Sequence, residues 1–378
     1  MKTLYLDYNA TTPIAPAVRE AMLPFLVEHY GNPSSGHALG RVSHEAVERA
    51  RGQVAALLGA EPDEVIFTSG GTEANNMALV GAVLQNAPPI RGHVVISALE
   101  HPAVVEPARF LERMGCELTV IGCDCAGVLD PAAVDDALRP DTVLVSIMLA
   151  NNEIGTLQPV RRIAASCRAR GVLCHTDAAQ AVGKIPVRVD ELGVDMLSIA
   201  GHKVYAPKGV GALYLRRGVR IEPVMHGAGH EGGRRPGTEN VPYLVALGTA
   251  ASLAAGHLKE HGGRLAELRD RLYRRLAASL PPEHGVNGAG APRLPNTLSI
   301  NFPGVVGSEL LARAAGLCAS TGTACHSGKT SMSATLSAIG LAPDVARGTV
   351  RLSVGWMTGE SEIDLAASRL LTAWRQLV

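Results

Sequence analysis

Thr142–Leu149 reads TVLVSIML, an apolar run with little alternation between apolar and polar positions. Such a run is typical of a strand buried on both faces, as in a parallel sheet covered by helices. Strand candidates of this kind alternate with segments of helical length: Glu64–Ser69, His93–Ala98, Glu117–Cys123, Thr142–Ala150, Val172–Ala178 and Asp195–Gly201. The pattern predicts an α/β fold with a mainly parallel, helix-covered sheet. Ligand sites of such folds lie at the carboxyl ends of the strands.

The C-terminal part of the chain has a different pattern. Residues from about Val241 to Leu280 are continuously helical in character, and Gly- and Pro-rich segments then interrupt the helix before strands resume. The elements expected there are strand Asn296–Phe302, helix Ser308–Gly316, a Ser/Thr/Gly-rich loop around Cys325 (about 318–336), strand Thr349–Gly355 and helix Glu360–Trp374. We therefore expect a large domain at 14–256 and a smaller α+β domain made of 1–13 and 257–378.

Composition narrows the possible partners. Lys plus Arg and Asp plus Glu each total 35, so no net field attracts nucleic acid or an anionic membrane, and neither is expected as a partner. The N-terminus lacks the apolar stretch of a signal peptide and no later run approaches a membrane span, which predicts a cytoplasmic location. With 47% hydrophobic and 19% charged residues, a lone monomer would expose much apolar surface, which favours a subunit interface. The cysteines form no pair of CxxC motifs, so neither disulfides nor a metal site are predicted.

Several polar residues directly follow predicted strands. Lys203 ends the segment SIAGHK and can serve as a Schiff-base amine, although a surface lysine is the plainer alternative. Asp177 lies at the end of its strand, where a buried carboxylate can pair with a pyridinium nitrogen. His101 can stack on a cofactor ring, although a lone histidine is more often structural. Residues 69–73, SGGTE, open a helix whose N–H groups and Thr72 hydroxyl suit a phosphate, but such turns are common.

An ordered set of motifs resembles the cysteine desulfurases, pyridoxal-phosphate (PLP) enzymes related to the class-V aminotransferases. The motifs are LDYNATT (6–12), SGGTE (69–73), EH (100–101), NNEIG (151–155), DAAQ (177–180) and GHK (201–203). Each is ordinary alone, but their joint order is specific, and together they span nearly the whole chain. The resemblance implies pyridoxal 5'-phosphate as cofactor and a fold-type-I homodimer. In this fold a large domain with a mainly parallel seven-stranded sheet stands beside a smaller α+β C-terminal domain.

The resemblance also assigns roles to individual residues. Lys203 would hold the cofactor, His101 would stack on its ring and Asp177 would bind its nitrogen. The full cofactor-binding set is Gly71, Thr72, His101, Asn152, Asp177, Gln180, His202, Lys203 and, reaching across the dimer to the partner's phosphate, Thr238. The substrate-binding set is Asn32, Asn152 and Arg351, with Arg351 clamping the substrate carboxylate.

Cys325 is the expected sulfur acceptor. It lies in ASTGTACHSG (319–328), whose small and polar residues suit a mobile loop and a nucleophilic thiol, whereas a buried structural cysteine is the alternative. The resemblance implies that Lys203 removes the α-proton of L-cysteine and that Cys325 takes the sulfur as a persulfide, leaving L-alanine. The sulfur would pass to an acceptor protein such as an iron–sulfur scaffold.

The sequence departs from the family pattern at several positions. Ala200 stands where relatives carry Ser before Gly-His-Lys, Lys329–Leu336 lacks the usual Pro-Ser, and Trp356 replaces a common Arg. Other segments are at least as similar to selenocysteine lyase, so release of selenide and alanine from L-selenocysteine is the alternative activity. A non-catalytic partner-binding platform would leave the joint presence of Lys203 and Cys325 unexplained.

Overall fold

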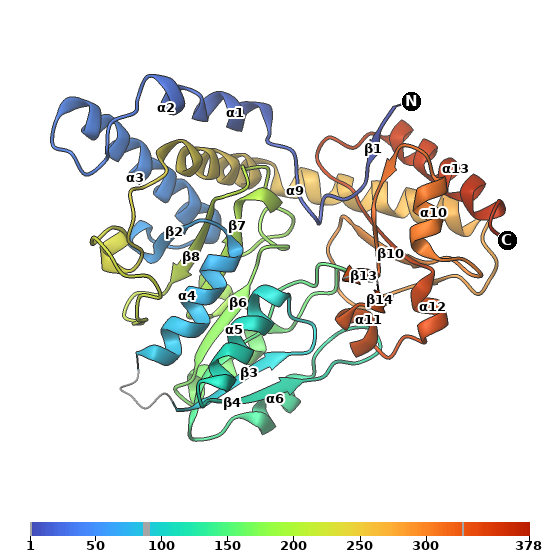
Figure 1. Ribbon diagram of the computed structural model, residues 1–378, viewed down its shortest axis with the longest axis horizontal. Helices are drawn as coiled ribbons and strands as arrows, with labels where there is room; N and C mark the ends of the chain where they lie inside the picture. The colour runs from blue at the N-terminus through green and yellow to red at the C-terminus, as the bar shows by residue number, and fades with distance from the viewer. Residues whose placement is uncertain (1, 86–90, 327–328) are drawn as a thin grey trace.

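The computed structural model describes residues 2–85, 91–326 and 329–378, and at 259, 323–326 and 329–331 it describes the backbone only. The molecule has two lobes (Figure 1). The larger lobe holds the long sheet and most of the helices. The smaller lobe holds the C-terminal strands and helices together with the N-terminal strand, and α9 (Val241–Ala277) runs from one lobe into the other.

In the described part of the chain, the larger lobe contains a seven-stranded sheet of order β2-β8-β7-β6-β5-β3-β4. Its strands are β2 (Val65–Thr68), β3 (His93–Ser97), β4 (Glu117–Ile121), β5 (Thr142–Ser146), β6 (Leu173–Asp177), β7 (Met196–Ala200) and β8 (Gly211–Leu215). β8 is antiparallel to both of its neighbours, and the other adjacent pairs are parallel. The predicted mainly parallel sheet is therefore confirmed, although β8 had no predicted counterpart.

Helices cover both faces of this sheet, which explains why its strands lack polar alternation. α4 (Gly71–Leu84) and α5 (Pro102–Arg113) pack on one face, and α3 (Ala38–Leu58), α7 (Val160–Ala169) and the first half of α9 belong to the core on the other. Within β5, Leu144 points into the first core and Val145 into the second. Because successive residues of a strand face opposite sides, both positions must be apolar.

The first half of α9 is itself strongly apolar. Among the described residues, Val241–Leu258 is long and apolar enough to cross a membrane by length and composition, with a mean hydropathy of 1.3, which corrects the expectation that no segment approaches a span. Here Leu244, Leu247 and Ala250 are almost fully buried in the core that α9 shares with α3. Packing inside the larger lobe therefore accounts for the apolar character of this segment.

The smaller lobe is built on an antiparallel sheet of order β12-β15-β10-β9. Its strands are β9 (Gly285–Val286), β10 (Thr297–Asn301), β12 (Ser320–Thr321) and β15 (Thr349–Ser353), packed with α10 (Gly307–Arg313), α13 (Glu360–Arg375) and the second half of α9. Leu4 and Leu6 belong to the core of the smaller lobe, and β1 (Leu4–Tyr5) pairs in parallel with β11 (Leu317–Cys318). These contacts support our proposed division of the chain into 14–256 and 1–13 with 257–378.

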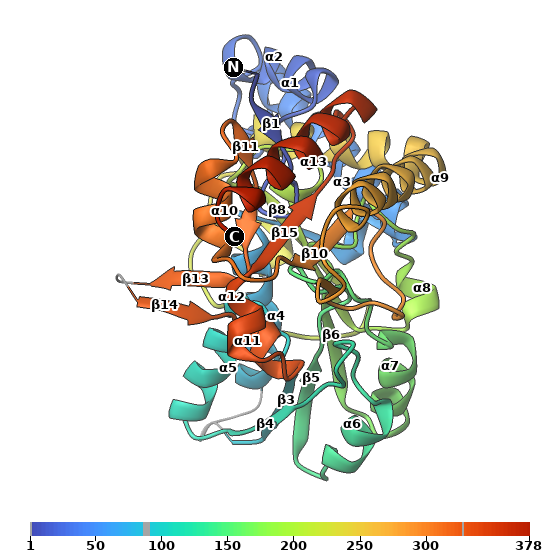
Figure 2. The same cartoon turned by 90° about the vertical axis from the view of Figure 1, so that its right-hand side faces the viewer.

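The segment around Cys325 differs from the expected irregular loop. β13 (Thr323–His326) pairs antiparallel with β14 (Lys329–Met332), which sets Cys325 opposite Thr330. Figure 2 shows this hairpin projecting from the side of the molecule. β-branched threonines at positions 323 and 330 favour extended backbone, and this preference prevails over the small residues that suggested a loop.

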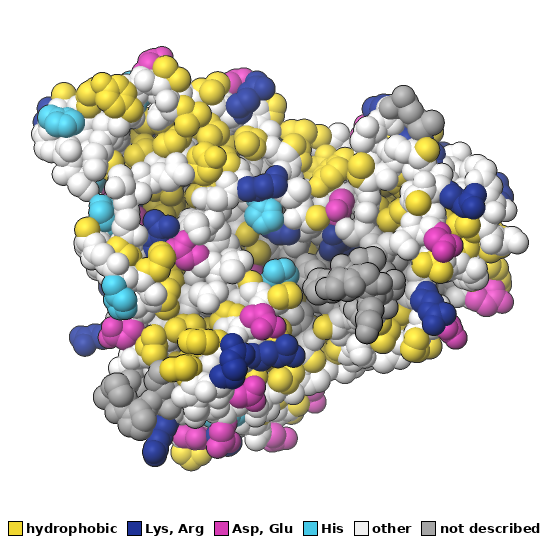
Figure 3. Space-filling view, viewed as in Figure 1, with side chains coloured by type: hydrophobic (Ala, Val, Ile, Leu, Met, Phe, Trp, Pro, Cys, Tyr) yellow, Lys and Arg dark blue, Asp and Glu magenta, His cyan; other side chains and the backbone are white. Residues whose placement is uncertain are grey.

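Hydrophobic side chains gather over α1 (Pro16–Met22) and α2 (Pro24–Val27) on the face seen in Figure 3. We call Leu23, Leu26, Val27 and Tyr30 the α1–α2 patch; these side chains are between 48% and 74% exposed. Single exposed apolar residues are ordinary, but a group on one surface indicates an interaction site.

The remaining elements of the described chain are short helices and 3-10 turns. They are α6 (Pro131–Ala137), α8 (Val189–Leu192), α11 (Ala334–Ala338), α12 (Pro343–Arg347), η1 (Pro62–Glu64), η2 (Gly201–Lys203) and η3 (Glu231–Gly233).

Candidate active site

A cavity of about 410 Å³ lies at the carboxyl ends of β2, β3, β5, β6 and β7. Parallel strands bring their carboxyl ends to one edge of a sheet, so segments far apart in sequence meet there. Of the residues predicted from the sequence, those that line it are Gly71, Thr72, His101, Asn152, Asp177, Gln180, His202, Lys203 and Arg351. A larger open cleft of about 1110 Å³ between residues such as Arg51 and His230 contains no predicted catalytic residue.

Lys203 points into this cavity from η2, directly after β7. Its Nζ donates hydrogen bonds to the backbone oxygens of Asn9 at 2.5 Å and Ala10 at 2.7 Å. Burial lowers the pKa of Lys203 to about 8, assisted by the positive charge of Arg351. A surface lysine is thereby excluded, and a useful fraction of the amine is neutral near neutral pH.

Asp177 ends β6 and is only 8% exposed. Its Oδ2 accepts a hydrogen bond from Asn75 Nδ2 at 2.8 Å, and its Oδ1 accepts one from the Ala179 N–H at 2.9 Å. These donors fix the carboxylate at the cavity wall while leaving lone pairs for a further partner. Asn75, on α4, was not predicted as a site residue, because nothing in its local sequence indicates contact with a strand a hundred residues later.

His101 forms the N-cap of α5, where its Nδ1 accepts a hydrogen bond from the Ala103 N–H at 3.1 Å. The acceptor role leaves the proton of the neutral ring on Nε2. The protein atoms packed around the ring lower the pKa of His101, and Asp177 and Lys203 act on it in opposite directions. A neutral imidazole with one edge anchored to a helix presents a fixed flat surface to the cavity.

The other end of the cavity is suited to an anion. α4 begins at Gly71, and its first intrahelical hydrogen bond runs from Ala74 N to Gly70 O, so the preceding N–H groups of the helix have no intrahelical acceptor. Ala200 lies close to this turn: a Cβ on Gly71 would come within 3.2 Å of the Ala200 Cβ. Burial lowers the pKa of His202 to about 4, so its ring is neutral and acts as a hydrogen-bonding group.

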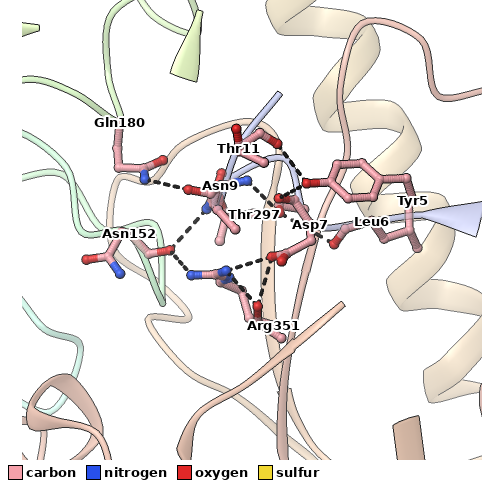
Figure 4. Close-up of polar contacts among 12 residues, drawn as sticks. Tyr5, Leu6, Asp7, Asn9, Thr11, Asn152, Gln180, Thr297 and Arg351 are labelled. Atoms are coloured by element: carbon pink, nitrogen blue, oxygen red, sulfur yellow. Dashed lines mark hydrogen bonds and ion pairs between the residues drawn. The ribbon is translucent and has the colours of Figure 1, made fainter. Parts of the chain in front are cut away.

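Arg351 reaches the cavity from β15 in the smaller lobe. Its Nη2 donates to Asp7 Oδ1 at 2.7 Å and to Ser320 Oγ at 2.9 Å, and its Nη1 donates to Asn152 O at 3.2 Å (Figure 4). Its Nε is buried and has no hydrogen-bond partner among the described residues. A surface arginine is excluded, and the orphaned Nε–H is a donor that an incoming carboxylate can satisfy.

Asn9 lies at the centre of the polar contacts in Figure 4. Its Nδ2 donates to Thr297 Oγ1 at 2.8 Å and to Asn152 O at 3.1 Å, while its backbone oxygen accepts from Gln180 Nε2 and Lys203 Nζ. The side chain therefore joins both lobes at the cavity. The motif around Asn9 contributed to the family resemblance, but its role as a hub could not be predicted without the fold.

Some predicted site residues lie elsewhere in this chain. Asn32 is exposed, accepts a hydrogen bond from the Ser34 N–H and is not part of the cavity wall. Thr238 is exposed and lines a different pocket with Ser69 and Asn240. The side chain of Cys325 lies outside the described residues, although its backbone belongs to β13.

Comparison with known proteins identifies the family. The model of the class-V aminotransferases matches residues 4–365, and the chain belongs to this family, whose solved relatives share its fold-type-I architecture. The chain is similar to a protein named cysteine desulfurase IscS from Dictyoglomus turgidum, with 45% identity over 366 residues covering 96% of this chain and 92% of the relative.

Two solved structures are similarly close in fold. One titled "NIFS-LIKE PROTEIN" has a TM-score of 0.92 and 35% identity, and it covers 99% of this chain and 100% of its own. Another, titled "SspA in complex with cysteine", has a TM-score of 0.84 and 34% identity, covering 93% of this chain and 99% of its own. The resemblance to cysteine desulfurases that the motifs indicated is confirmed.

Proposed function

We propose that the cavity binds pyridoxal 5'-phosphate covalently at Lys203. Three groups that converge in one cavity carry the proposal: the desolvated amine of Lys203, the fixed carboxylate of Asp177 and the flat neutral ring of His101. The cavity volume of about 410 Å³ falls within the usual range for cofactor sites. The residues present therefore fit the cofactor.

Each part of the cavity suits one part of this cofactor. Asp177 would pair with the ring nitrogen, His101 would cover one ring face, and Asn152 and Gln180 would reach the 3-oxygen. The unpaired N–H groups at the start of α4, the Thr72 hydroxyl and His202 would hold the phosphate. When bound, the cofactor withdraws electrons from the α-carbon of an amino acid and so weakens the bonds around it.

The proposed substrate is L-cysteine, because the relatives of this chain carry the name cysteine desulfurase. Arg351 would bind the substrate carboxylate with its buried Nε–H and hold the amino acid over the cofactor. Lys203, once free, would take the α-proton, since an amine with a pKa of about 8 can both accept and return a proton near neutral pH.

Cys325 is the proposed sulfur acceptor. Its thiolate would attack the substrate sulfur, so that a sulfur–sulfur bond forms and the carbon–sulfur bond of the substrate breaks. The electron pair of the broken bond stays with the substrate carbon, which gains a proton and leaves as L-alanine. The terminal sulfur on Cys325 would then pass to an acceptor protein, for which an iron–sulfur scaffold is our proposal.

Product analysis tests this function. Purified protein is incubated with L-cysteine or L-selenocysteine in the presence of a reductant, and alanine is measured together with sulfide or selenide. We expect alanine and sulfide from L-cysteine, with turnover abolished by Cys325→Ser and retained by Cys318→Ser, a control at an exposed cysteine. Strong preference for L-selenocysteine would favour the lyase alternative, and formation of neither product would reject both.

We further propose a cytoplasmic homodimer. The exposed α1–α2 patch supports a subunit interface. His230 Nδ1 and Glu239 Oε2 support it too, because both are buried beside the large cleft without a hydrogen-bond partner among the described residues, although Glu239 Oε2 lies 3.9 Å from His230 Nε2. Thr238, exposed and outside the cavity of its own chain, would reach the partner's phosphate site. Sedimentation equilibrium should give twice the mass of the chain, and Val27→Asp with Tyr30→Asp should shift the protein to monomer. A monomeric parent protein would contradict the proposal.

A further inference from the structure

Lys184 is a buried lysine behind the active site. It is 7% exposed, does not line the cavity and has no carboxylate within ion-pair distance among the described residues. Its Nζ donates to Gln180 Oε1 at 2.8 Å and to Asn9 Oδ1 at 3.2 Å. Burying a lysine without a counter-ion is costly, so its location calls for an explanation beyond packing.

The lysine determines which way the neighbouring amides point. A lysine amine that donates both contacts requires an oxygen at each acceptor position. Gln180 must therefore direct Oε1 toward Lys184, which leaves Nε2 to donate to Asn9 O at 2.9 Å and to face the cavity with its second hydrogen. If Gln180 turned over, a carbonyl oxygen would face the cavity instead.

The same amine fixes Asn9. Asn9 Oδ1 accepts from Lys184 and from Asn296 Nδ2 at 2.9 Å, so its Nδ2 is turned toward Thr297 and Asn152. With its side chain fixed on all sides, Asn9 holds its backbone oxygen at 2.5 Å from Lys203 Nζ. Lys184 thus contacts Asn9, whose backbone oxygen accepts a hydrogen bond from the reactive amine, and Gln180, which donates to the same oxygen.

We propose that Lys184 is a positioning residue of the active site, which acts through Gln180 and Asn9 to present an N–H donor to the cofactor's 3-oxygen and to hold Lys203. This inference rests on the proposed PLP function. It goes beyond that function, because Lys184 does not itself line the cavity and would act through two residues that do, Gln180 and Asn9.

Removal of Lys184 should raise the pKa of the nitrogen that links Lys203 to the cofactor. An N–H donor at the 3-oxygen stabilises the negative charge that otherwise attracts a proton to that nitrogen, so loss of the donor favours protonation. Burial lowers the pKa of Lys184 well below its usual value, and the positive charges of Lys203 and Arg351 lower it further, so the expected effect rests on the lost donor rather than on a lost charge. The other charged or titratable groups that face Lys203 remain in place: Asp7 from the N-terminal segment, His101 from α5, Asp177 from β6, His202 from η2 and Arg351 from β15.

The test is a pH titration of the visible absorbance of the bound cofactor in the loaded enzyme. Lys184→Met keeps the volume and removes the donors. We expect the midpoint of the absorbance titration of Lys184→Met to lie about 0.5–1 pH unit above that of the parent. A shift of this size corresponds to one hydrogen bond of ordinary net strength. Leu370→Ala, in the core of the smaller lobe, is the control for lost stability and should leave the midpoint unchanged.

A double-mutant cycle separates positioning from simple structural support. If Lys184 acts largely through Gln180, Lys184→Met should shift the midpoint much less in a Gln180→Leu background than in the parent. Lys184→Gln carries the test if the methionine variant does not fold. A midpoint that moves no further than in Leu370→Ala would overturn the proposal. Absence of visible absorbance in the parent itself would instead reject the proposed PLP function.

Discussion

Replacement of Lys203 by methionine should make the cofactor-free protein more stable at neutral pH, although it removes the proposed catalytic amine. Burial lowers the pKa of Lys203 from 10.5 to about 8, because the charged form is poorly solvated in the folded chain. Well below pH 8 the amine is mostly protonated in both the folded and the unfolded protein. The charge on Lys203 then lowers the free energy of unfolding by about 3 kcal/mol, the full amount that corresponds to a pKa shift of this size.

Lost hydrogen bonds reduce this gain. Asn9 O keeps its bond from Gln180, but Ala10 O loses the Lys203 donor, which costs about 1 kcal/mol. Lys203→Met should therefore increase the free energy of unfolding by about 2 kcal/mol at pH 7. Between pH 8 and 10.5 the unfolded state binds more protons than the folded state, so the parent gains stability as the pH rises and the difference should approach zero near pH 10.

Urea unfolding of both cofactor-free proteins at pH 7 and pH 10 measures this difference. The comparison between the two pH values separates the charge effect from the change in packing, which is independent of pH. A methionine variant that is less stable than the parent at pH 7, or a difference that does not decrease toward pH 10, would refute the claim that Lys203 is a buried, destabilised cation.

Further predictions concern the ring site, the phosphate site and the junction between lobes. Asp177→Asn should lower turnover of L-cysteine about a hundredfold or more, because it removes the charge proposed to balance the cofactor ring, whereas the exposed control Asp190→Asn should not; equal activities would contradict that role. Ala200→Ser should lower the dissociation constant of PLP about two- to tenfold by adding a hydroxyl at the phosphate end, and weaker binding measured by equilibrium dialysis would argue against the site. Trp356→Ala should lower the free energy of unfolding by about 2 kcal/mol, because it removes a ring whose centroid is stacked 3.8 Å from that of the Tyr205 ring. Trp356→Phe should retain most of that stability in the same urea assay.

The central sheet was predictable because its signal is local. A strand such as β5, apolar at every position, indicates cover on both faces, and a parallel order then forces its carboxyl end next to those of its neighbours. Lys203 and Asp177 could be placed together on this basis, since each directly follows or ends a strand. β8 was missed because a short segment between turns gives too little periodicity to identify.

Contacts between distant segments could not be predicted in the same way. Asn75 donates a hydrogen bond to Asp177, and Lys184 donates one to Asn9. The sequence next to these residues gives no sign of either contact. The small residues around Cys325 predict a loop but are compatible with a hairpin too, and the pairing of β13 with β14 decides between the two. Polar networks of this kind depend on the completed fold.

The most direct test of the account is the mass of the Cys325 peptide after a single turnover. The PLP-loaded protein is mixed with an equal amount of L-cysteine without reductant, the exposed thiols are blocked, and the digested peptide that contains Cys325 is analysed by mass spectrometry. We predict one additional sulfur atom on Cys325 together with one equivalent of alanine, and no addition when Lys203 is replaced. Formation of alanine with the extra sulfur on another cysteine, or with none on the protein, would contradict the assignment of Cys325 as the sulfur acceptor.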